Sequence, residues 1–206
     1  MTVIITMDSL TPADVRPLAR LHREAFPGFF LSTLGEPFLV QFYRGFLTDD
    51  SAVSVVARGA DGCVWGAVVG TTEPAGFFRR LVNSRWPGFV LSSARVVVLN
   101  PRAAPRLLRA VRYRGDTPAG CQGALLSSLC VDPSLQGTGV GRQLVEAWTR
   151  EVASRGVVDM AFLTTDAEDN SGVNRFYQAQ GWVLSDSYAT REGRSMNRYT
   201  KRLDAR

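Results

Sequence analysis

A glycine-rich stretch, residues 136–141 (QGTGVG), is where residue types and spacing point most directly to chemistry. It follows an apolar run that ends at Val131, and from Val140 onward apolar residues recur at every fourth position. This order predicts a strand, a turn and a helix. Because the first N–H groups of a helix have no internal partner and carry the positive end of its dipole, we expect a phosphorylated ligand to bind there.

The spacing argues against two common nucleotide-binding turns. A P-loop needs Gly-Lys-Ser/Thr at the start of the helix, where this chain has Gly141-Arg142-Gln143. A dinucleotide fingerprint needs G-x-G-x-x-G, an acid about 20 residues further on and a second half-sheet. Asp166 is a loose match for the acid, but the glycine spacing differs and too few residues follow. A glycine-rich helix entry that binds no ligand stays open.

Residues 136–141, read as Gln-x-x-Gly-x-Gly, resemble the Q/R-x-x-G-x-G/A acyl-CoA signature of the GNAT superfamily of N-acyltransferases. Residues 170–182 resemble the N-x-x-A-x-x-F-Y-x-x-x-G-F segment that closes the cofactor site of that family. Val173 stands where a small residue is usual, and Trp182 replaces the common Phe. Both motifs lie within residues 125–188, and the resemblance extends more loosely to the whole chain. It implies acetyl-CoA as the co-substrate.

The resemblance also implies a role for individual residues. Backbone N–H groups around residues 129–131 are expected to bind the acyl carbonyl and the pantetheine arm, and the turn is expected to hold the pyrophosphate. Asn170, Asn174 and Tyr177 fall on one helical face, which should look toward the thiol. The predicted cofactor-binding residues are Leu129, Cys130, Val131, Gln136, Gly137, Thr138, Gly139, Val140, Gly141, Arg142, Asn170 and Asn174.

Direct attack of an amine on the thioester needs an acid and a base. Tyr177 is the predicted acid, because a phenol with a pKa near ~10 stays protonated at neutral pH; a purely packing role stays open. Glu73, at the end of a predicted strand, is the predicted base, with a solvated turn residue as the alternative. Glu24, His22, Asp166 and water relaying to a distant carboxylate also stay open as bases. No covalent cysteine intermediate is expected.

Composition indicates a globular domain spanning residues 1–206, with 45% hydrophobic and 21% charged residues. Cys63, Cys121 and Cys130 cannot all pair and lack metal-ligand spacing, and His22 is the single histidine. We therefore expect no disulfide framework, no metal site and a reducing compartment. The sequence shows neither a cleavable leader nor an apolar run of membrane-spanning length, so we expect a cytoplasmic protein.

The expected elements fall into two halves around residues 74–115. The first half has a strand at Val3–Met7, a helix capped by Thr11 and ending near Ala25, a helix at 33–47, and a hairpin of strands Ala52–Arg58 and Cys63–Thr72. The second has strands at 125–131 and 157–165 joined by a helix from Val140 to about Gly156, a helix around Tyr177, and closing strands Trp182–Tyr188 and Ser195–Leu203. The strand-helix-strand unit predicts a parallel arrangement, whose crossover must be right-handed. With the resemblance, this order predicts an α/β (α+β mixed) fold with a GNAT-like central mixed sheet of about seven strands, flanking helices and an extra helical insertion between strands 3 and 4.

The expected insertion, residues 74–115, is rich in arginine and contains no Asp or Glu. Apolar residues predict helices around 77–82 and 107–111, with 86–99 a further helix or an irregular crossing. A solvated accessory layer, anion recognition and contact with an anionic membrane surface stay open as interpretations. Its arginines are Arg79, Arg80, Arg85, Arg95, Arg102, Arg106, Arg109, Arg112 and Arg114.

The predicted acceptor side includes Phe26, Phe29 and Phe30, an aromatic loop that in the family would lie over the acceptor pocket, and also Asp166; core packing of the loop is the alternative. The predicted function is acetyl transfer to a primary amine of a small molecule, with an anionic amine such as a nucleotide-linked amino sugar favoured by the arginines. A non-catalytic acyl-CoA sensor and a protein amine acetyltransferase are the alternatives. We expect no nucleic-acid partner and no stable membrane insertion; a homodimer stays open.

Overall fold

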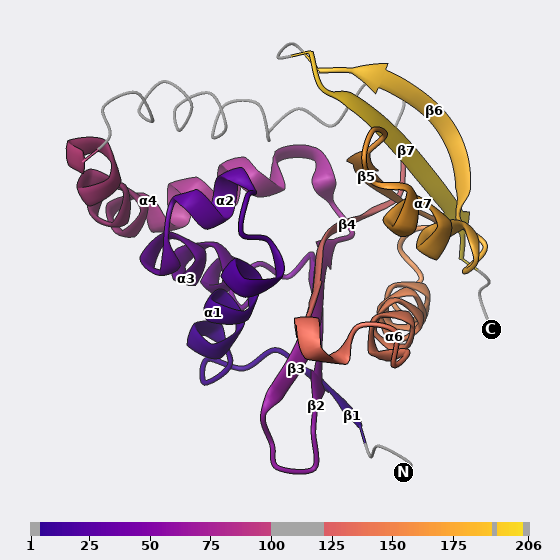
Figure 1. The fold of residues 1–206 in the computed structure, drawn as a ribbon, viewed down its shortest axis with the longest axis horizontal. Helices are drawn as coiled ribbons and strands as arrows, with labels where there is room; N and C mark the ends of the chain where they lie inside the picture. Colours follow the sequence, from indigo (N-terminus) through magenta and orange to yellow (C-terminus); the bar gives the residue numbers. More distant parts are fainter. Residues whose placement is uncertain (1–4, 100–121, 191–192, 204–206) are drawn as a thin grey trace.

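The computed structural model describes residues 5–99, 122–190 and 193–203 (Figure 1). Its centre is one seven-stranded sheet in the order β1-β2-β3-β4-β5-β7-β6. The strands are β1 Thr6–Ser9, β2 Ala52–Arg58, β3 Val64–Thr71, β4 Ala124–Val131, β5 Met160–Asp166, β6 Val183–Ala189 and β7 Ser195–Arg202. Strands β4 and β5 are parallel, and the other neighbours are antiparallel. The predicted mixed sheet is therefore confirmed.

Helices cover both faces of this sheet. Figure 1 shows α1, α3 and α4 on one side and α6 and α7 on the other. The helices are α1 Val15–Ala25, α2 Phe30–Thr33, α3 Glu36–Gly45, α4 Pro74–Leu99, α6 Val140–Ser154 and α7 Ser171–Gln178, with a 3₁₀ turn at Pro133–Leu135. Each face has its own core, with α1, α3 and α4 packed over one and α6 and α7 over the other.

Helix α6 follows the predicted apolar stripe. Val140, Leu144, Trp148 and Val152 are each at most 1% exposed. Burial of side chains of this size stabilises the fold by about 1.5–3 kcal/mol each. The stripe therefore fixes how α6, and with it the glycine turn, sits against the sheet.

Helix α4 confirms the helical insertion between the third and fourth strands. Its backbone leaves helical geometry at Gly76, where φ is 78°, and at Arg85, where φ is −129° and ψ is 18°, so it is kinked. Phe77, Leu81 and Phe89 are buried in the core beneath it. The helix predicted around 107–111 lies outside the described residues.

Several predicted boundaries are wrong, and β1 ends at Ser9 and not at Met7. Thr11 does not cap α1; Asp14 is the N-cap residue, and its carboxylate accepts hydrogen bonds from the Thr11 amide and hydroxyl. The helix predicted at 33–47 corresponds to α3, Glu36–Gly45, and a separate short helix α2 ends at Thr33, because Gly35 between them adopts a φ of 87° that a helix does not allow. Strand β5 begins at Met160 and not at residue 157, and Val157 is 64% exposed. An apolar run alone did not distinguish the loop from the strand.

Candidate active site

Strands β4 and β5 diverge soon after they start. Among the described residues they pair only at Ala124 with Ala161 and at Leu125 with Phe162, whereas β4 stays paired with β3 up to Val131. The register with β3 also shifts in the middle of β4, which is the mark of a β-bulge. The edge of β4 that faces β5 therefore has unpaired backbone groups beyond Leu125.

The ladder with β3 shows which N–H groups lie on this open edge. The Asp132 amide donates to the Trp65 carbonyl at 2.8 Å. Because residues of an antiparallel strand alternate between facing the partner and facing away, Cys130 also faces β3, while Leu129 and Val131 face the open edge. Of the three residues predicted to bind the acyl and pantetheine groups, Leu129 and Val131 can donate from the backbone, and the Cys130 amide is turned to β3.

The glycine turn lies at the start of α6. Gly137 and Gly139 have φ of 79° and 89°, and a Cβ at either would meet no described atom within 4 Å. The first intrahelical hydrogen bond runs from the Gln143 amide to the Gly139 carbonyl, so the amides of residues 140–142 have no partner within the helix. Residues 136–139 are exposed. The start of α6 thus has N–H donors that the helix does not use, directly after an exposed turn, as an anionic pyrophosphate requires.

Two side chains of this turn already have partners. The Thr138 hydroxyl donates to the Leu135 carbonyl at 2.6 Å, which stabilises the turn. The Arg142 guanidinium donates to Glu146 at 2.8 Å across one helical turn on the exposed surface. Arg142 would have to leave Glu146 to contact a phosphate, at little cost because exposed pairs contribute roughly 0–1 kcal/mol.

Helix α7 is anchored by the two predicted asparagines. The Asn170 side chain donates to the Thr165 hydroxyl at 2.6 Å and to the Asp166 carbonyl at 3.3 Å. The buried Asn174 side chain donates to the carbonyls of Asp166 and Asn170 and accepts from Asn197 and Tyr199. With its donors and acceptors engaged inside the protein, Asn174 holds α7 against β5 and β7. A role for Asn170 and Asn174 in cofactor binding stays a prediction.

Tyr177 shares the buried face of α7 with Asn174. It is 6% exposed, and its ring packs edge-on against Trp182 at 5.9 Å between centroids. Burial raises the pKa of Tyr177 above its ordinary value, so the phenol keeps its proton at neutral pH. This is the protonation state that a proton donor needs.

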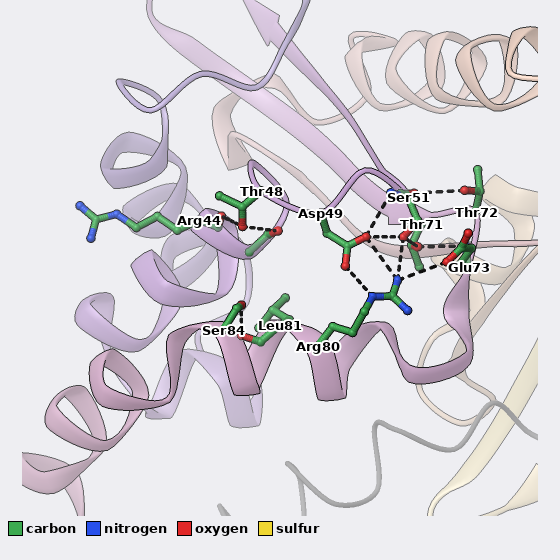
Figure 2. A network of polar contacts seen from close by, with 11 residues as sticks. Arg44, Thr48, Asp49, Ser51, Thr71, Thr72, Glu73, Arg80, Leu81 and Ser84 are labelled. Atoms are coloured by element: carbon green, nitrogen blue, oxygen red, sulfur yellow. Dashed lines mark hydrogen bonds and ion pairs between the residues drawn. The ribbon is translucent and has the colours of Figure 1, made fainter.

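Glu73 lies at the opposite end of β4 from the open edge. Figure 2 shows its side chain beside Arg80 of α4, with 3.6 Å between Glu73 Oε2 and Arg80 Nη2. It follows Thr71, which pairs with Leu125, at the closed end of the β4/β5 divergence. Leu129 lies four residues beyond Leu125 along β4, a span of about 13 Å. The Glu73 side chain is 70% exposed, and a direct role as base would require it to leave Arg80 and cross this distance.

The arginine of this network is not available for a ligand. Arg80 donates to Asp49 at 2.8 Å and to the Ser51 hydroxyl at 3.0 Å (Figure 2). Burial opposes ionisation of Asp49, but the hydrogen bonds from Arg80 and Ser51 and the charge of Arg80 together outweigh it and lower the pKa of Asp49. The acids that neutralise Arg80 therefore come from outside the arginine-rich segment. Arg79 is exposed, and burial, followed by the charge of Arg44, lowers the pKa of Arg85.

On the α1 and α3 face of the sheet, the aromatic loop contacts His22 through Phe26. Phe26 lies 5.0 Å from the His22 ring and 5.2 Å from the Phe29 ring, measured between centroids. Phe29 is 50% exposed, while Phe26 and Phe30 are partly buried against the core. The loop thus combines the two predicted alternatives, a core contact and an exposed aromatic surface.

Two contacts at this site were not predicted from the sequence. Asp166 is held by Arg194 with hydrogen bonds of 2.6 and 2.8 Å, so its carboxylate is already paired. His22 Nδ1 lies 2.6 Å from the Tyr43 hydroxyl, and both side chains are buried. The available sequence signal was a tyrosine on the apolar face of a phenylalanine-rich helix, which resembles ordinary core packing.

The described residues contain no group of three or more His, Cys, Asp or Glu side chains arranged to hold a metal ion. Within the same residues, no helix combines the length and apolar character needed to cross a membrane.

Comparison with known protein families gives a match within the second half of the chain. Residues 107–184 match the family model described as Acetyltransferase (GNAT) domain. No curated protein matches the chain.

Solved structures match over nearly the whole length. A GNAT-family protein from Desulfovibrio desulfuricans is 16% identical with a TM-score of 0.62, covering 98% of this chain and 100% of its own. The ribosomal-protein-S18-alanine N-acetyltransferase from Escherichia coli is 14% identical with a TM-score of 0.59, covering 98% and 95%. The protein yncA from Salmonella typhimurium, solved with its cofactor acetyl-CoA, is 13% identical with a TM-score of 0.60, covering 98% and 95%. These likenesses show a shared fold.

Proposed function

We propose that this chain is an acyltransferase that transfers an acetyl group from acetyl-CoA to a primary amine of a small molecule, and the match of residues 107–184 to a GNAT acetyltransferase domain and the shared fold support this. The observation that carries this proposal is the continuity between the open edge of β4 and the start of α6. Leu129 and Val131 present N–H groups on that edge, and the glycine turn that follows presents further unused N–H groups. A thioester-bearing arm with a pyrophosphate at its other end needs this sequence of donors.

The proposed roles follow from these positions. The Leu129 amide donates to the acyl carbonyl oxygen and stabilises the negative charge that develops there. The Val131 amide contacts the pantetheine arm, and the amides of residues 140–142 hold the pyrophosphate. Tyr177 gives its proton to the departing thiolate. Acetyl-CoA supplies the activated thioester when bound.

We further propose that the acceptor amine carries phosphate or carboxylate, as a nucleotide-linked amino sugar does. The exposed Arg79 and the half-exposed Phe29 support this, because a guanidinium and an aromatic wall suit an anionic ring-bearing ligand. Arg80 supports this role less, because its charge is already paired with Asp49. The other arginines on which the proposal depends, Arg102, Arg106, Arg109, Arg112 and Arg114, lie outside the described residues.

A thiol-release assay tests the function. Acetyl-CoA and the protein are incubated with a panel of anionic, neutral and cationic amines and with a peptide that has a free N-terminal amine, and a reaction without amine is the control. We expect CoA release that depends on a small amine. If calorimetry shows acetyl-CoA binding while no acceptor releases CoA, the protein is a sensor. Fastest release with the peptide would make it a protein acetyltransferase.

A further inference from the structure

A buried chain of polar side chains lies on the α1 and α3 face of β4. His22 Nδ1 lies 2.6 Å from the Tyr43 hydroxyl oxygen, which lies 3.8 Å from Sγ of Cys130. His22 is 4% exposed and Tyr43 is 1% exposed. Burying polar groups is costly unless they are hydrogen-bonded. Polar side chains inside an otherwise apolar core are therefore expected where function requires them.

The chain reaches the strand that carries the proposed acyl site. Ser128 and Cys130 flank Leu129, and because alternate side chains of a strand share a face, both point toward α1 and α3. Ser128 lies close enough to Tyr43 that its hydroxyl favours the ionised phenol and opposes part of the rise in the pKa of Tyr43. Ser128 is partly exposed, so it is the member of the chain that a ligand can meet. Tyr177 belongs to the core on the opposite face of the sheet.

The protonation states suit a relay. Burial, and then the neighbouring Cys130, raise the pKa of Tyr43 above its ordinary value, so Tyr43 remains a phenol and passes a proton only as it receives another. With the Tyr43 hydroxyl assigned as the donor, His22 Nδ1 is the acceptor. Burial raises the pKa of Cys130 to about 11, which makes its thiol a poor nucleophile at neutral pH.

We propose that His22 takes up the proton of the acceptor amine through Ser128 and Tyr43; this rests on the proposed acetyl transfer. An ammonium N–H bond breaks and its proton passes to the Ser128 oxygen, while the Ser128 proton passes to Tyr43 and the Tyr43 proton to His22 Nδ1. The nitrogen lone pair so released forms the C–N bond, and the C–S bond breaks. Tyr177 gives its proton to the CoA thiolate, and the second proton lost by nitrogen then reprotonates Tyr177. His22 returns the first proton to solvent after the reaction.

This arrangement separates the two proton transfers in space. The amine loses its proton on the α1 and α3 face of β4, and the thiolate gains one on the α7 face. Figure 1 shows these helices on opposite sides of the sheet, with β4 between them. Glu73, at the closed end of the strand divergence, is not needed as a direct base.

The test compares His22→Asn and Tyr43→Phe with wild type. Asn at position 22 keeps an oxygen that can accept from the Tyr43 hydroxyl but cannot take up a proton at neutral pH, so it separates hydrogen bonding from basicity. Thr149→Val is the matched control, since it removes a buried hydroxyl on the α6 side of the sheet. We expect kcat to fall about 100-fold in both relay variants, with acetyl-CoA Kd within about twofold of wild type and the control unchanged.

The acceptor provides a second measurement. Amines with a pKa below neutrality arrive without the extra proton, so the deficit of His22→Asn should shrink for them. A wild-type kcat in folded His22→Asn, or an equal loss with amines of high and low pKa, would make the pair structural and overturn the proposal. Should Tyr43→Phe fail to fold, His22→Asn and Ser128→Ala decide. A wild-type protein that releases no CoA with any amine would instead refute the proposed function itself.

Discussion

The guanidinium of Arg58 donates two hydrogen bonds to the carboxylate of Asp14, 2.6 Å from Nη1 to Oδ1 and 2.7 Å from Nη2 to Oδ2. Asp14 is 3% exposed, and the Arg58 side chain is 19% exposed. Burial opposes ionisation of Asp14, but hydrogen bonds from Arg58 and Thr11 outweigh it and lower the pKa of Asp14. The pair joins the end of β2 to the start of α1, the helix that carries His22.

Replacing Asp14 by Asn should lower the free energy of unfolding by about 3 kcal/mol, because it leaves the Arg58 charge without its partner. Urea denaturation followed by tryptophan fluorescence measures the change. Asp8→Asn is the control, since Asp8 is half exposed at 3.4 Å from Arg58 and should cost less than about 1 kcal/mol. Equal effects of the two substitutions on the free energy of unfolding would contradict the larger contribution expected of the buried Asp14–Arg58 pair.

The same pair predicts a pH dependence. Because the folded pKa of Asp14 is lowered, its contribution is complete above the unfolded value near 3.8 and is lost as pH falls through the folded pKa. The stability difference between wild type and Asp14→Asn should therefore be constant near neutrality and narrow below about pH 4. Urea midpoints measured from pH 7 to pH 3 test this, and a difference that stays constant down to pH 3 would refute it.

Gly141→Asp should abolish acetyl-CoA binding and leave the protein folded. A Cβ at this position would lie 3.5 Å from the Phe176 ring, an ordinary contact, and an acid in the first turn favours the helix. The carboxylate would repel the pyrophosphate, so we expect affinity to fall about 100-fold or more by calorimetry. Gly141→Ala adds the same Cβ without charge and should bind within a few-fold of wild type. Unchanged acetyl-CoA affinity in folded Gly141→Asp would mean that the turn only starts the helix and does not bind the cofactor.

Tyr177→Phe should lower kcat by about 100-fold while acetyl-CoA affinity stays unchanged, because a lost proton donor affects the chemical step. Steady-state kinetics and calorimetry on the same preparation separate the two quantities. Tyr188→Phe, which removes a phenol on β6, is the control. A change in kcat below about threefold would assign Tyr177 to packing against Trp182.

Anionic amines should outcompete cationic ones, and their apparent KM should rise with ionic strength, since salt at ~0.1 M already screens charges beyond about 10 Å. Charge reversal at two of Arg106, Arg109 and Arg112 should raise that KM without changing acetyl-CoA affinity. Arg79→Glu tests the exposed arginine of α4 separately. The proposal is wrong if turnover is fastest with an uncharged or polycationic amine and if these substitutions do not change it. Residues 74–115 would then form only a basic outer layer.

Local patterns in the sequence determined much of the scaffold. The four-residue apolar period from Val140 predicted α6, and β-rich runs on either side of a glycine turn predicted the β2/β3 hairpin, because periodicity directly reports which face is buried. Glycines at 137 and 139 marked a turn whose positive φ values other residues rarely adopt. Predicted helix boundaries were wrong where a distant contact determines the cap. Thr11 was predicted to cap α1, but the N-cap residue is Asp14, which is held by Arg58, 44 positions further along the chain.

Tertiary structure alone decided which side chains meet. Nothing local places Tyr43 beside His22 and Cys130, 21 and 87 positions away from it, because that contact depends on how α1 and α3 pack on β4. The open edge of β4 likewise arises from the divergence of β5, a property of two strands that neither strand's sequence contains. The glycines thus determined the backbone conformation of the turn locally, whereas the proposed proton path depends on packing between elements distant in the chain.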